Sequence, residues 1–433
     1  MAYLLSLCIL ISLVPTYSIS AVAAEDKLVQ ISKKSFRLAP GVTEYELVTN
    51  DNDLSKQQVG HIMEISPDSS SEIRVGYNDY NIRAIASGSN WAMVRPTEQA
   101  QKAETAAQID VIGVVNGDFF NMANGCPSGY TVMQGMTVRD VNSSCFWIDS
   151  AGKAHISANR AEVESICTQE NVAVQEAVGG GAILVEDGQR TNAGGNYGDA
   201  ANPRTVAGIK PDGTVILYMV NGRQAPYSVG MVYGDLADIM LHLGCVDAIN
   251  LDGGGSSVFA TQREGERNNN GTAGLTVRCR PSDGYERSVS TSLMVVSTAA
   301  SDGVFDHATI TPAQEIYTPN STVQFSAAGI DKAGKPAPLP DGLTWTVASG
   351  DGVIDANGLY YGSSNEGVVR IELKNGSAVV GTAIIEQRWP DKLGFTNASI
   401  SLDFGKSSDL TFNPTYKGQP IHYKDGDFIW GVD

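Results

Sequence analysis

The sequence predicts a large domain of many strands and a few helices, followed by a smaller part made of strands alone. Strand-like apolar runs separated by loops continue to about residue 298, among them "QQVGHIMEIS", "IDVIGVV", "TVILYMV" and "VDAINL". Two stretches of the same region, "MVRPTEQAQKAETAAQ" and "YGDLADIMLHLG", predict helices. Beyond residue 304 the runs become short and alternating, with frequent Gly, Pro, Asn and Asp turns and no helical period.

The stretch "YGDLADIMLHLG" has the clearer helical pattern. Its apolar residues fall on one face of a helix: Leu236, Ile239, Met240 and Leu243. Gly244 follows where a helix C-terminal cap is expected. The pattern therefore predicts a helix that ends just before Gly244.

The alternating runs between residues 304 and 388 predict a small Ig-like β-sandwich. This stretch contains no Cys, so we expect Trp345 to pack in its core without a disulfide. Residues 389–433 begin a further β-rich segment and stop in mid-strand, which indicates a fragment of a longer protein. The predicted folded parts are thus 25–298, 304–388 and 389–433.

Residues 1–24 have the pattern of a secretory signal peptide. Residues 4–14 are apolar, and Ala21-Val22-Ala23-Ala24 is a small-residue cleavage site. No Lys or Arg precedes the apolar stretch, and the stretch is too short for a comfortable membrane span. No later segment reaches the roughly 18 apolar residues of a membrane helix. We therefore expect a secreted or cell-surface protein without a transmembrane helix.

The composition limits the possible partners and cofactors. The 433-residue chain has a net charge of −18, which argues against a nucleic-acid-binding surface, because such a surface needs a basic patch. No CxxC or HExxH motif occurs, the five His are scattered, and "NDND" at 50–53 does not match an EF-hand loop. Neither a metal nor a cofactor is expected.

The chain contains six Cys, of which Cys8 lies in the signal segment. An oxidising compartment permits disulfides, and Cys126 and Cys145, which are near in sequence, are the predicted pair. Five Cys outside the signal segment is an odd number, so at least one thiol is free in a monomer.

Three strand-like runs of the large domain end in an amide or acid followed by glycine. They lead into Asn116-Gly117, Asn221-Gly222 and Asp252-Gly253. A hairpin turn is the favoured interpretation for Asn221, while for Asn116 the hairpin and a ligand site are equally open. For Asp252 a turn is not enough, because Gly253-Gly254-Gly255-Ser256-Ser257 is longer than any turn needs.

The segment after Asp252 is typical of a place where backbone approaches a ligand closely. Successive N–H groups can form an anion nest, and Ser256 and Ser257 add hydroxyl donors. The spacing matches neither the phosphate loop of NTPases nor the nucleophile elbow of α/β-hydrolases. Cations come from two other segments, which contain Arg204, Arg223, Arg280 and Arg287 together with the acids Asp283 and Glu286.

Four segments in this order carry a resemblance to a known family: "NGDFF", "NPRTVAGIKPDGTVILYMVNGR", "GMVYGDLADIMLHLGCVDAINLDGGGSSVF" and "RPSDGYERSVSTSLMVV". Over most of residues 28–298 the chain resembles the phosphodiester glycosidases. The resemblance implies an α+β fold with a mixed β-sheet core. It also implies a secreted bacterial-type enzyme that acts on glycosyl phosphodiesters of cell-wall or exopolysaccharide polymers.

Carried over residue by residue, the family motifs cover Asn116, Arg204, Gly222, Asn250, Asp252, Gly253, Gly254, Gly255, Ser256, Ser282, Asp283 and Arg287. Two positions depart from the pattern. Some members have Gly in place of Asp118, and Arg223 stands where others have Gln.

These residues give the expected site. The catalytic set is Asp252, Asn116, Arg204 and Asp118, and the substrate-binding set is Asn221, Gly222, Arg223, Asn250, Gly253, Gly254, Gly255, Ser256, Ser257, Ser282, Asp283 and Arg287. The expected reaction is hydrolysis of the bond between an anomeric carbon and a phosphate oxygen of an N-acetylglucosamine-1-phospho type substrate. Asp252 is a base, a nucleophile or a charge-stabilising group.

Two alternatives stay open at this point. The domain is either an enzyme or a non-catalytic phosphoglycan-binding surface protein, and the glycine run is either a ligand site or a packing element between strand and helix. The Ig-like part either spaces the large domain from the cell surface or binds glycan.

Overall fold

The computed structural model describes residues 29–50, 56–86, 91–193, 198–266, 274–395, 412–424 and 426–428. The predicted signal peptide, Asp51 and Asp53 of "NDND", and residues 396–411 of the last predicted segment lie outside the described residues. Within the described ranges, no helix is both long enough and apolar enough to cross a membrane.

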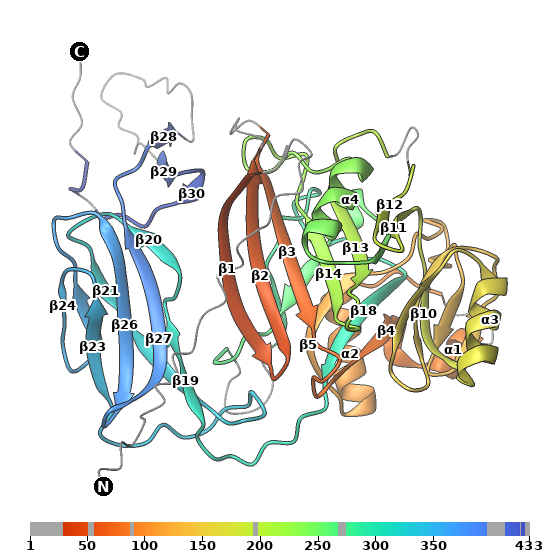
Figure 1. Ribbon diagram of the computed structural model, residues 1–433, viewed down its shortest axis with the longest axis horizontal. Helices are drawn as coiled ribbons and strands as arrows, with labels where there is room; N and C mark the ends of the chain where they lie inside the picture. The colour runs from red at the N-terminus through yellow and green to blue at the C-terminus, as the bar shows by residue number, and fades with distance from the viewer. Residues whose placement is uncertain are drawn as a thin grey trace, which may run out of the picture.

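An eight-stranded sheet forms the centre of the large domain, in the order β1-β2-β3-β14-β13-β15-β11-β12 (Figure 1). Its strands are β1 (Val29–Ala39), β2 (Val42–Asn50), β3 (Gln58–Ile65), β11 (Ile183–Glu186), β12 (Gln189–Arg190), β13 (Arg204–Ile209), β14 (Val215–Val220) and β15 (Asp247–Asn250).

A five-stranded sheet in the order β17-β16-β5-β18-β4 packs against it. Its strands are β4 (Ser71–Tyr77), β5 (Asp110–Asn116), β16 (Phe259–Thr261), β17 (Thr276–Val277) and β18 (Thr291–Ser297). A third sheet, β7-β6-β10-β8-β9, comprises β6 (Thr131–Met133), β7 (Met136–Arg139), β8 (Cys145–Asp149), β9 (Ala154–Ser157) and β10 (Val174–Gly179).

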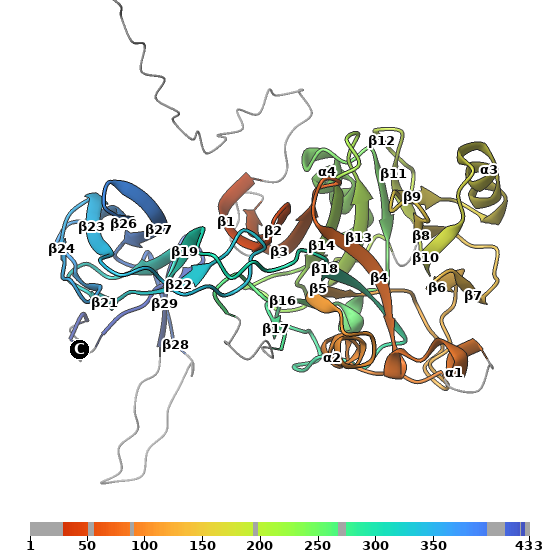
Figure 2. The same cartoon turned by 90° about the horizontal axis from the view of Figure 1, so that it is seen from below.

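Short helices complete the large domain: η2 (Asn78–Tyr80), α1 (Ile82–Ala86), α2 (Pro96–Ala107), α3 (Arg160–Glu170), α4 (Tyr233–His242) and η3 (Gly254–Ser256). In Figure 2, α1 and α2 lie together at the lower edge of the domain, while α4 lies beside β13 and β14. The two predicted helices are confirmed as α2 and α4. Gly244, just after α4, has a φ of +90°, as a C-terminal glycine should.

The central strands of the eight-stranded sheet are buried on both faces. Met63 and Leu217 face the five-stranded sheet, where they share a core with Val114. On the opposite face, Leu236 and Met240 of α4 cover the sheet. All six residues of β14 are buried, which explains why this strand is apolar throughout instead of alternating.

The expected mixed sheet is wrong, because every strand pair of the three sheets is antiparallel. A parallel neighbour requires a long crossover, usually through a helix. Helix α4 does connect β14 to β15 in this way, but both strands pair with β13 from opposite sides. They run in the same direction without touching, so the crossover produces no parallel pair.

Residues 304–388 contain strands and no helix, as the alternating runs predict. The strands are β19 (His307–Thr311), β20 (Glu315–Tyr317), β21 (Thr322–Gln324), β22 (Ser326–Ile330), β23 (Thr344–Ser349), β24 (Val353–Ile354), β25 (Leu359–Tyr361), β26 (Gly367–Asn375) and β27 (Ala378–Gln387). They form three small sheets, with β20 parallel to β27. Trp345 packs beside Phe325 in their common core. An Ig-like topology for this part stays a prediction.

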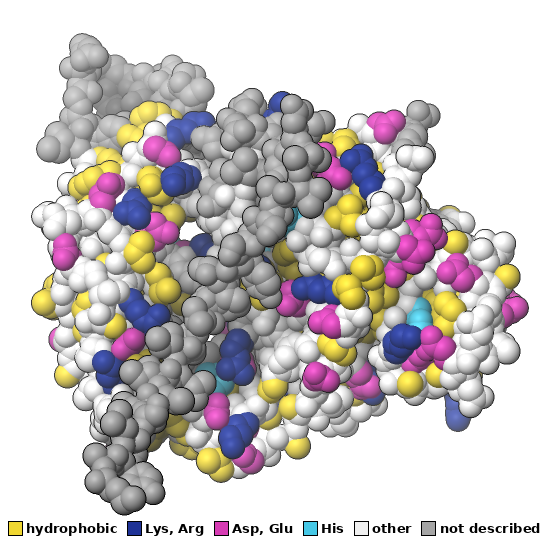
Figure 3. Space-filling view, in the orientation of Figure 1, with side chains coloured by type: hydrophobic (Ala, Val, Ile, Leu, Met, Phe, Trp, Pro, Cys, Tyr) yellow, Lys and Arg dark blue, Asp and Glu magenta, His cyan; other side chains and the backbone are white. Residues whose placement is uncertain are grey.

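A last small sheet follows, built from β28 (Lys392–Phe395), β29 (Phe412–Tyr416) and β30 (Gln419–Pro420). The space-filling view in Figure 3 shows acidic and basic side chains interspersed over the described part of this face.

The expected Cys126–Cys145 disulfide is not formed, and all five Cys of the described residues are free thiols. Cys145 is buried at the start of β8, in a cluster with Tyr130 and Trp147. The Cys126 thiol instead donates to the carbonyl of Pro127, in a loop held by its own turn contacts. Closeness in sequence does not bring the two sulfur atoms together here.

Candidate active site

The predicted site residues meet where the central strands of the eight-stranded sheet begin and end. Strand β13 begins at this end of the sheet, and its antiparallel neighbours β14 and β15 finish there, with Arg204 opposite Val220 and Val206 opposite Asn250. The chain segments after β14 and β15 therefore leave the sheet next to Arg204. Polar side chains beyond such strand ends are held by a rigid framework.

Asn116, at the end of β5, connects its own five-stranded sheet to the eight-stranded sheet at these strand ends. Its buried side chain donates to the carbonyl of Asp252 at 2.7 Å. The amide oxygen accepts from the Thr205 hydroxyl at 2.6 Å and from the Val258 N–H at 3.1 Å. Asn116 thus fixes both ends of the glycine-rich segment, which is a positioning role. No hairpin follows it, because the chain continues into a loop toward β6.

The three glycines after Asp252 leave room for protein groups. A Cβ on Gly253 would lie 2.9 Å from the carbonyl of Pro203, and one on Gly254 would lie 3.1 Å from Nη2 of Arg223. A Cβ on Gly255 would lie 2.0 Å from Nη2 of Arg287. Two arginines therefore pack directly on the backbone of this loop, and any side chain there would displace them.

The expected anion nest does not form from this backbone. The N–H groups of Gly254, Ser256 and Ser257 all donate to carbonyls, those of Pro203, Gly253 and Gly254. The N–H of Gly253 donates to the Asp252 carboxylate at 2.8 Å. Four of the five N–H groups from Gly253 to Ser257 thus donate to protein oxygens, so positive charge at the site comes mainly from arginine side chains.

Asp252 is partly exposed at the head of this loop. Burial raises its pKa to about 6, against the opposing effects of the Ser256 hydroxyl, the Gly253 N–H and Arg287. Its backbone N–H donates to the carbonyl of Gly117 at 3.1 Å, which places it beside the loop that carries Asp118.

Asp118 is the second carboxyl of the site and is buried. Its Oδ2 accepts from the Gly129 N–H at 2.7 Å. Burial raises its pKa to about 7, partly opposed by that N–H, and the charge of Asp252 raises it further. A Cβ on Gly179 would lie 2.7 Å from Asp118 Oδ2, so the carboxyl is packed between Gly129 and Gly179.

The two carboxyls ionise in order. The charge of Asp252 contributes to the raised pKa of Asp118, which is about 7, whereas the pKa of Asp252 is about 6. Asp252 therefore loses its proton first. Between the two pKa values the site holds one carboxylate and one carboxylic acid.

Three arginines surround the loop. Arg204 is buried and donates through Nη2 to the carbonyl of Ala200 at 2.9 Å. Burial lowers its pKa, Tyr233 opposes this effect, and nearby Arg223 adds to it. Arg287 donates to Asp283 at 2.8 Å and to the Ser256 hydroxyl at 3.4 Å.

The favoured hairpin at Asn221-Gly222 is wrong. After β14 the chain turns back only further on, where Gln224 and Ser228 form an antiparallel bridge; Met231 then bridges to Asn202 before the chain enters α4. The buried Asn221 side chain donates to the carbonyl of Val59 at 3.0 Å and accepts from the Arg280 N–H at 2.7 Å. Asn221 therefore fixes the segment that carries Asp283 and Arg287.

Gly222 is needed for close packing. A Cβ there would lie 2.6 Å from the backbone N of Pro203. Arg223 follows with a φ of +62° and donates to Asn202 at 2.9 Å.

Several buried oxygens of the site have no partner among the described residues: Asn250 Oδ1, Ser257 Oγ and Ser282 Oγ. Buried polar atoms of this kind are uncommon in folded proteins. The amide nitrogen of Asn250 is in use and donates to the Tyr233 hydroxyl at 3.2 Å. The site therefore retains unused acceptors beside its carboxyls and arginines.

Two features of the site are absent from the sequence prediction. Tyr233 lies under Arg204, although the sequence only places it in a helix. The second glycine run, Gly179-Gly180-Gly181, packs against Asp118 and Asn250. Its signal was present in the sequence, since it repeats the triple glycine of the predicted site.

A cavity of about 750 Å³ lies away from the site, lined in part by Lys153, His155, Lys210 and Asp247. Asp149, His155 and Glu170, beside it, bring possible metal ligands within 4.8 Å of one another. Their polar atoms already have protein partners, since His155 contacts Asp149 at 2.9 Å and Lys153 contacts Glu170 at 2.8 Å. We assign no metal to this group.

Residues 110–296 match the family model described as phosphodiester glycosidase. The chain is 29% identical over 183 residues to the SPbeta prophage-derived uncharacterized protein YomE of Bacillus subtilis (strain 168). The match covers 40% of this chain and 26% of that protein, so the chain aligns with about a quarter of its relative's length.

Solved structures give more distant likenesses. The zebrafish N-acetylglucosamine-1-phosphodiester alpha-N-acetylglucosaminidase catalytic domain, auto-inhibited by its pro-peptide, is 22% identical with a TM-score of 0.45, covering 62% of this chain and 88% of that one. A putative exported protein of Burkholderia pseudomallei K96243 is 13% identical with a TM-score of 0.44, covering 64% and 98%.

Proposed function

We propose that this protein is a glycosidase that hydrolyses the bond between an anomeric carbon and a phosphate oxygen in sugar-1-phosphodiesters. The observation that carries the proposal is the pairing of Asp252 and Asp118, two carboxyls with separated pKa values, beside a cluster of arginines. The family match over residues 110–296 covers both carboxyls and all three arginines and supports the same reaction.

The reaction places specific demands on such a site. As the glycosidic bond breaks, positive charge develops on the sugar and negative charge on the leaving phosphate. A carboxylate near the anomeric carbon stabilises the first charge, and arginines stabilise the second. Asp252 and the group Arg204, Arg223 and Arg287 meet these two demands in one place.

Asp252 is the group that acts at the sugar. With its pKa raised to about 6 it is ionised near neutral pH and basic enough to take a proton from water. Asp118, with a pKa of about 7, is still partly protonated under the same conditions, which limits the like charge that the pocket carries. Whether Asp252 activates water or bonds to the sugar depends on its distance from the substrate.

The arginines act at the phosphate. Each guanidinium can form two parallel hydrogen bonds with phosphate oxygens. Because four of the five N–H groups from Gly253 to Ser257 already donate to protein oxygens, the phosphate contacts of the proposed complex come mainly from these side chains. Asn116 holds the glycine-rich loop in place, and Asn221 holds the segment after Arg280, so both residues position the arginines indirectly.

We propose an N-acetylglucosamine-1-phospho type substrate within a cell-wall or exopolysaccharide polymer, met outside the cell. The predicted signal peptide and the resemblance of the motifs support this setting. The partner is then a phosphoglycan, and the strand-only part after residue 304 is a spacer or a glycan contact.

The test is release of free sugar from a panel of sugar-1-phosphodiesters, including wall-polymer fragments. We expect the wild type to release N-acetylglucosamine, and Asp252→Asn to reduce kcat by on the order of 10²- to 10⁴-fold, as loss of an acid–base group does. Asp187→Asn, at an exposed carboxyl beside the separate cavity, serves as a matched control with wild-type rate. Full activity of Asp252→Asn would make the assignment wrong.

A non-catalytic phosphoglycan-binding module is the second candidate, because the arginines and the unpartnered hydroxyls of Ser257 and Ser282 alone describe an anion-binding site. Arg204→Ala separates the two functions. An enzyme loses turnover in this variant, whereas a binding module shows no sugar release in any form and loses only affinity for wall polymer.

A further inference from the structure

Tyr233 lies directly under the guanidinium of Arg204. The distance from Arg204 Cζ to the centre of the Tyr233 ring is 4.7 Å. Both residues are almost fully buried, with exposed fractions of 6% for Arg204 and 8% for Tyr233. Ring and guanidinium therefore meet out of water, where an attraction between a cation and an aromatic face is strongest.

Backbone groups fix Arg204 in the remaining directions. Nη2 donates to the carbonyl of Ala200 at 2.9 Å, and Nε donates to that of Met231 at 3.4 Å. These carbonyls and the ring are uncharged. They orient the arginine without adding a negative charge beside it.

Tyr233 is held both by its backbone and by its hydroxyl. It is the first residue of α4, and its backbone N–H donates to the carbonyl of Gly198 at 2.8 Å. Its hydroxyl accepts from Nδ2 of Asn250 at 3.2 Å. Burial raises the pKa of the Tyr233 hydroxyl, Arg204 opposes this, and Asp252 adds to it, so the ring lies within reach of both charges.

We propose that Tyr233 is a positioning residue whose ring holds Arg204 toward the phosphate of the substrate. This inference rests on the proposed function, since it assigns Arg204 to the phosphate. The ring face is the part that acts, so a phenylalanine should replace the tyrosine, while an aliphatic side chain should not.

Binding of inorganic phosphate tests this role without turnover. Phosphate is titrated calorimetrically into the full-length wild type, Tyr233→Phe, Tyr233→Leu, Arg204→Ala and the double variant Arg204→Ala/Tyr233→Leu at fixed ionic strength. We expect Tyr233→Leu to weaken phosphate binding about tenfold, within the range of a desolvated cation–ring contact. Tyr233→Phe should stay within about twofold of the wild type, because the ring face remains.

The double variant shows whether the effect passes through Arg204. If the ring acts by orienting this arginine, Tyr233→Leu has no further effect once Arg204 is removed. An equal loss in both backgrounds would mean that the ring acts by another route and would overturn the proposal.

Tyr45 provides a matched control. The distance from Lys33 Nζ to the centre of the Tyr45 ring is 3.9 Å. Tyr45 lies on β2, which is separated from β13 by β3 and β14. Tyr45→Leu therefore removes a ring beneath a cation elsewhere in the same sheet, and we expect wild-type phosphate affinity. If Tyr233→Leu does not fold, Tyr233→Met takes its place; if neither folds while Tyr45→Leu does, the ring is structural and the proposal is wrong.

The outcomes separate this inference from the proposed function. Ring-dependent phosphate binding without sugar release by the wild type refutes the glycosidase and supports the role of Tyr233. Sugar release with equal phosphate affinity in wild type and Tyr233→Leu supports the glycosidase and overturns the role of Tyr233. Failure of the wild type to bind phosphate also overturns it.

Discussion

At the scale of single residues, the site depends on two carboxyls that differ in their surroundings. Asp118 is enclosed by Gly129 and Gly179, whereas Asp252 is partly exposed and receives hydrogen bonds from its own loop. Burial raises both pKa values, to about 7 and about 6. Separated values of this kind allow one carboxyl to hold a proton while its neighbour carries a charge.

This order of ionisation predicts a bell-shaped pH dependence of kcat/KM. Activity should rise with pH as Asp252 ionises with a pKa of about 6 and fall as Asp118 ionises with a pKa of about 7. The optimum lies between these values. Rates for one sugar-1-phosphodiester across this range measure it.

Asp118→Asn is the informative variant for that profile. It keeps the shape of the side chain and never ionises, so the alkaline fall should disappear while the acid limb stays. An unchanged alkaline limb in Asp118→Asn would assign the second pKa to another group.

The grouping of these site residues is predictable from the sequence, whereas many of their contacts are not. Asp252 is predicted from its place at a strand end, and Arg204 is predicted as a flanking cation. The structure places both at the same end of the eight-stranded sheet. Tyr233 could not be predicted as a partner of Arg204, because the contact depends on how α4 folds back onto β13. The packing of Gly179 against Asp118 has the same origin, in a contact between separate sheets.

At the scale of elements, the glycine-rich loop is the surface on which two arginine side chains pack. The sequence suggested that Gly253, Gly254 and Gly255 open the backbone to a ligand. In the structure Arg223 and Arg287 occupy that space, and most of the loop N–H groups donate to protein oxygens. The glycines are therefore required because two charged side chains lie on them.

Gly255→Ala should weaken catalysis more than stability. Its Cβ would lie 2.0 Å from Nη2 of Arg287 and 2.5 Å from Oδ1 of Asp283, so the methyl must displace this ion pair. Gly255 has no positive φ, so the backbone tolerates alanine. We expect kcat/KM to fall about 10- to 100-fold, consistent with misplacement of a substrate-orienting group.

Gly367→Ala is the control for that substitution, because a Cβ there meets no atom within 4 Å. Steady-state kinetics and thermal unfolding are measured on both variants. Loss of folding in Gly255→Ala, with Gly367→Ala unaffected, would favour the view that the loop is only a packing element.

Elements with strong patterns were predictable, and those set by tertiary contacts were not. Helix α4 has a full apolar stripe, whereas α3 has a single buried residue, Val163, and escaped prediction. The turn at Asn221 was expected as a hairpin from its dipeptide. It is instead shaped by Val59 and Arg280, which are distant in sequence.

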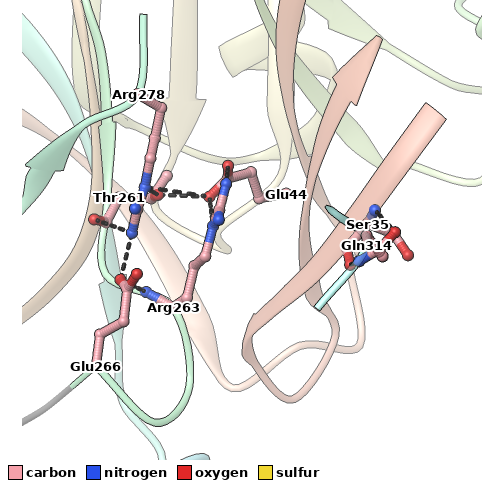
Figure 4. A network of polar contacts seen from close by, with 7 residues as sticks. All are labelled: Ser35, Glu44, Thr261, Arg263, Glu266, Arg278 and Gln314. Atoms are coloured by element: carbon pink, nitrogen blue, oxygen red, sulfur yellow. Dashed lines mark hydrogen bonds and ion pairs between the residues drawn. The ribbon is translucent and has the colours of Figure 1, made fainter. Parts of the chain in front are cut away.

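At the scale of the whole molecule, the strand-only part is fixed to the large domain at several points. His307 contacts Glu264 at 2.9 Å, Glu264 also contacts Arg37 at 3.4 Å, and Lys335 forms an ion pair with Asp110. Beside this interface, Arg263 and Arg278 converge on the buried Glu44 (Figure 4). Burial raises the pKa of Glu44, but the hydrogen bonds and charge of Arg263, together with the Thr261 hydroxyl and the charge of Arg278, outweigh burial and lower this pKa below its ordinary value.

The His307 contact should make stability depend on pH. The hydrogen bond that His307 donates to the Glu264 carboxylate raises the pKa of His307, with Asp306 adding to this effect and burial and Arg37 opposing it. A raised histidine pKa stabilises the fold fully below the unfolded value of about 6.5, and this is lost as pH rises through the folded value. We expect His307→Gln to lower the free energy of unfolding by about 1 kcal/mol at pH 6 and by less at pH 9.

Urea denaturation of both proteins at the two pH values measures this difference. His242→Gln, at an exposed histidine of α4, controls for a general effect of losing an imidazole. A difference between wild type and His307→Gln that grows toward pH 9 would contradict the assignment.

The lack of helices in residues 304–388 was predictable from the change in sequence pattern near residue 304, but the contacts of this part with the large domain were not. Its contacts join side chains from segments far apart in the chain, and no local pattern marks them. The sequence left the second part as a spacer or a glycan contact, whereas these contacts attach it directly to the large domain.

A further contact between the strand-only part and the large domain has a consequence for association between molecules. Gln314 uses its side-chain amide as a strand would, accepting from the Ser35 N–H at 2.9 Å and donating to the Ser35 carbonyl at 2.6 Å (Figure 4). Ser35 lies on β1, the outermost strand of the eight-stranded sheet. An uncovered edge strand of this length is a template for sheet-to-sheet aggregation. A single glutamine thus interrupts the pairing pattern that a second molecule would have to follow.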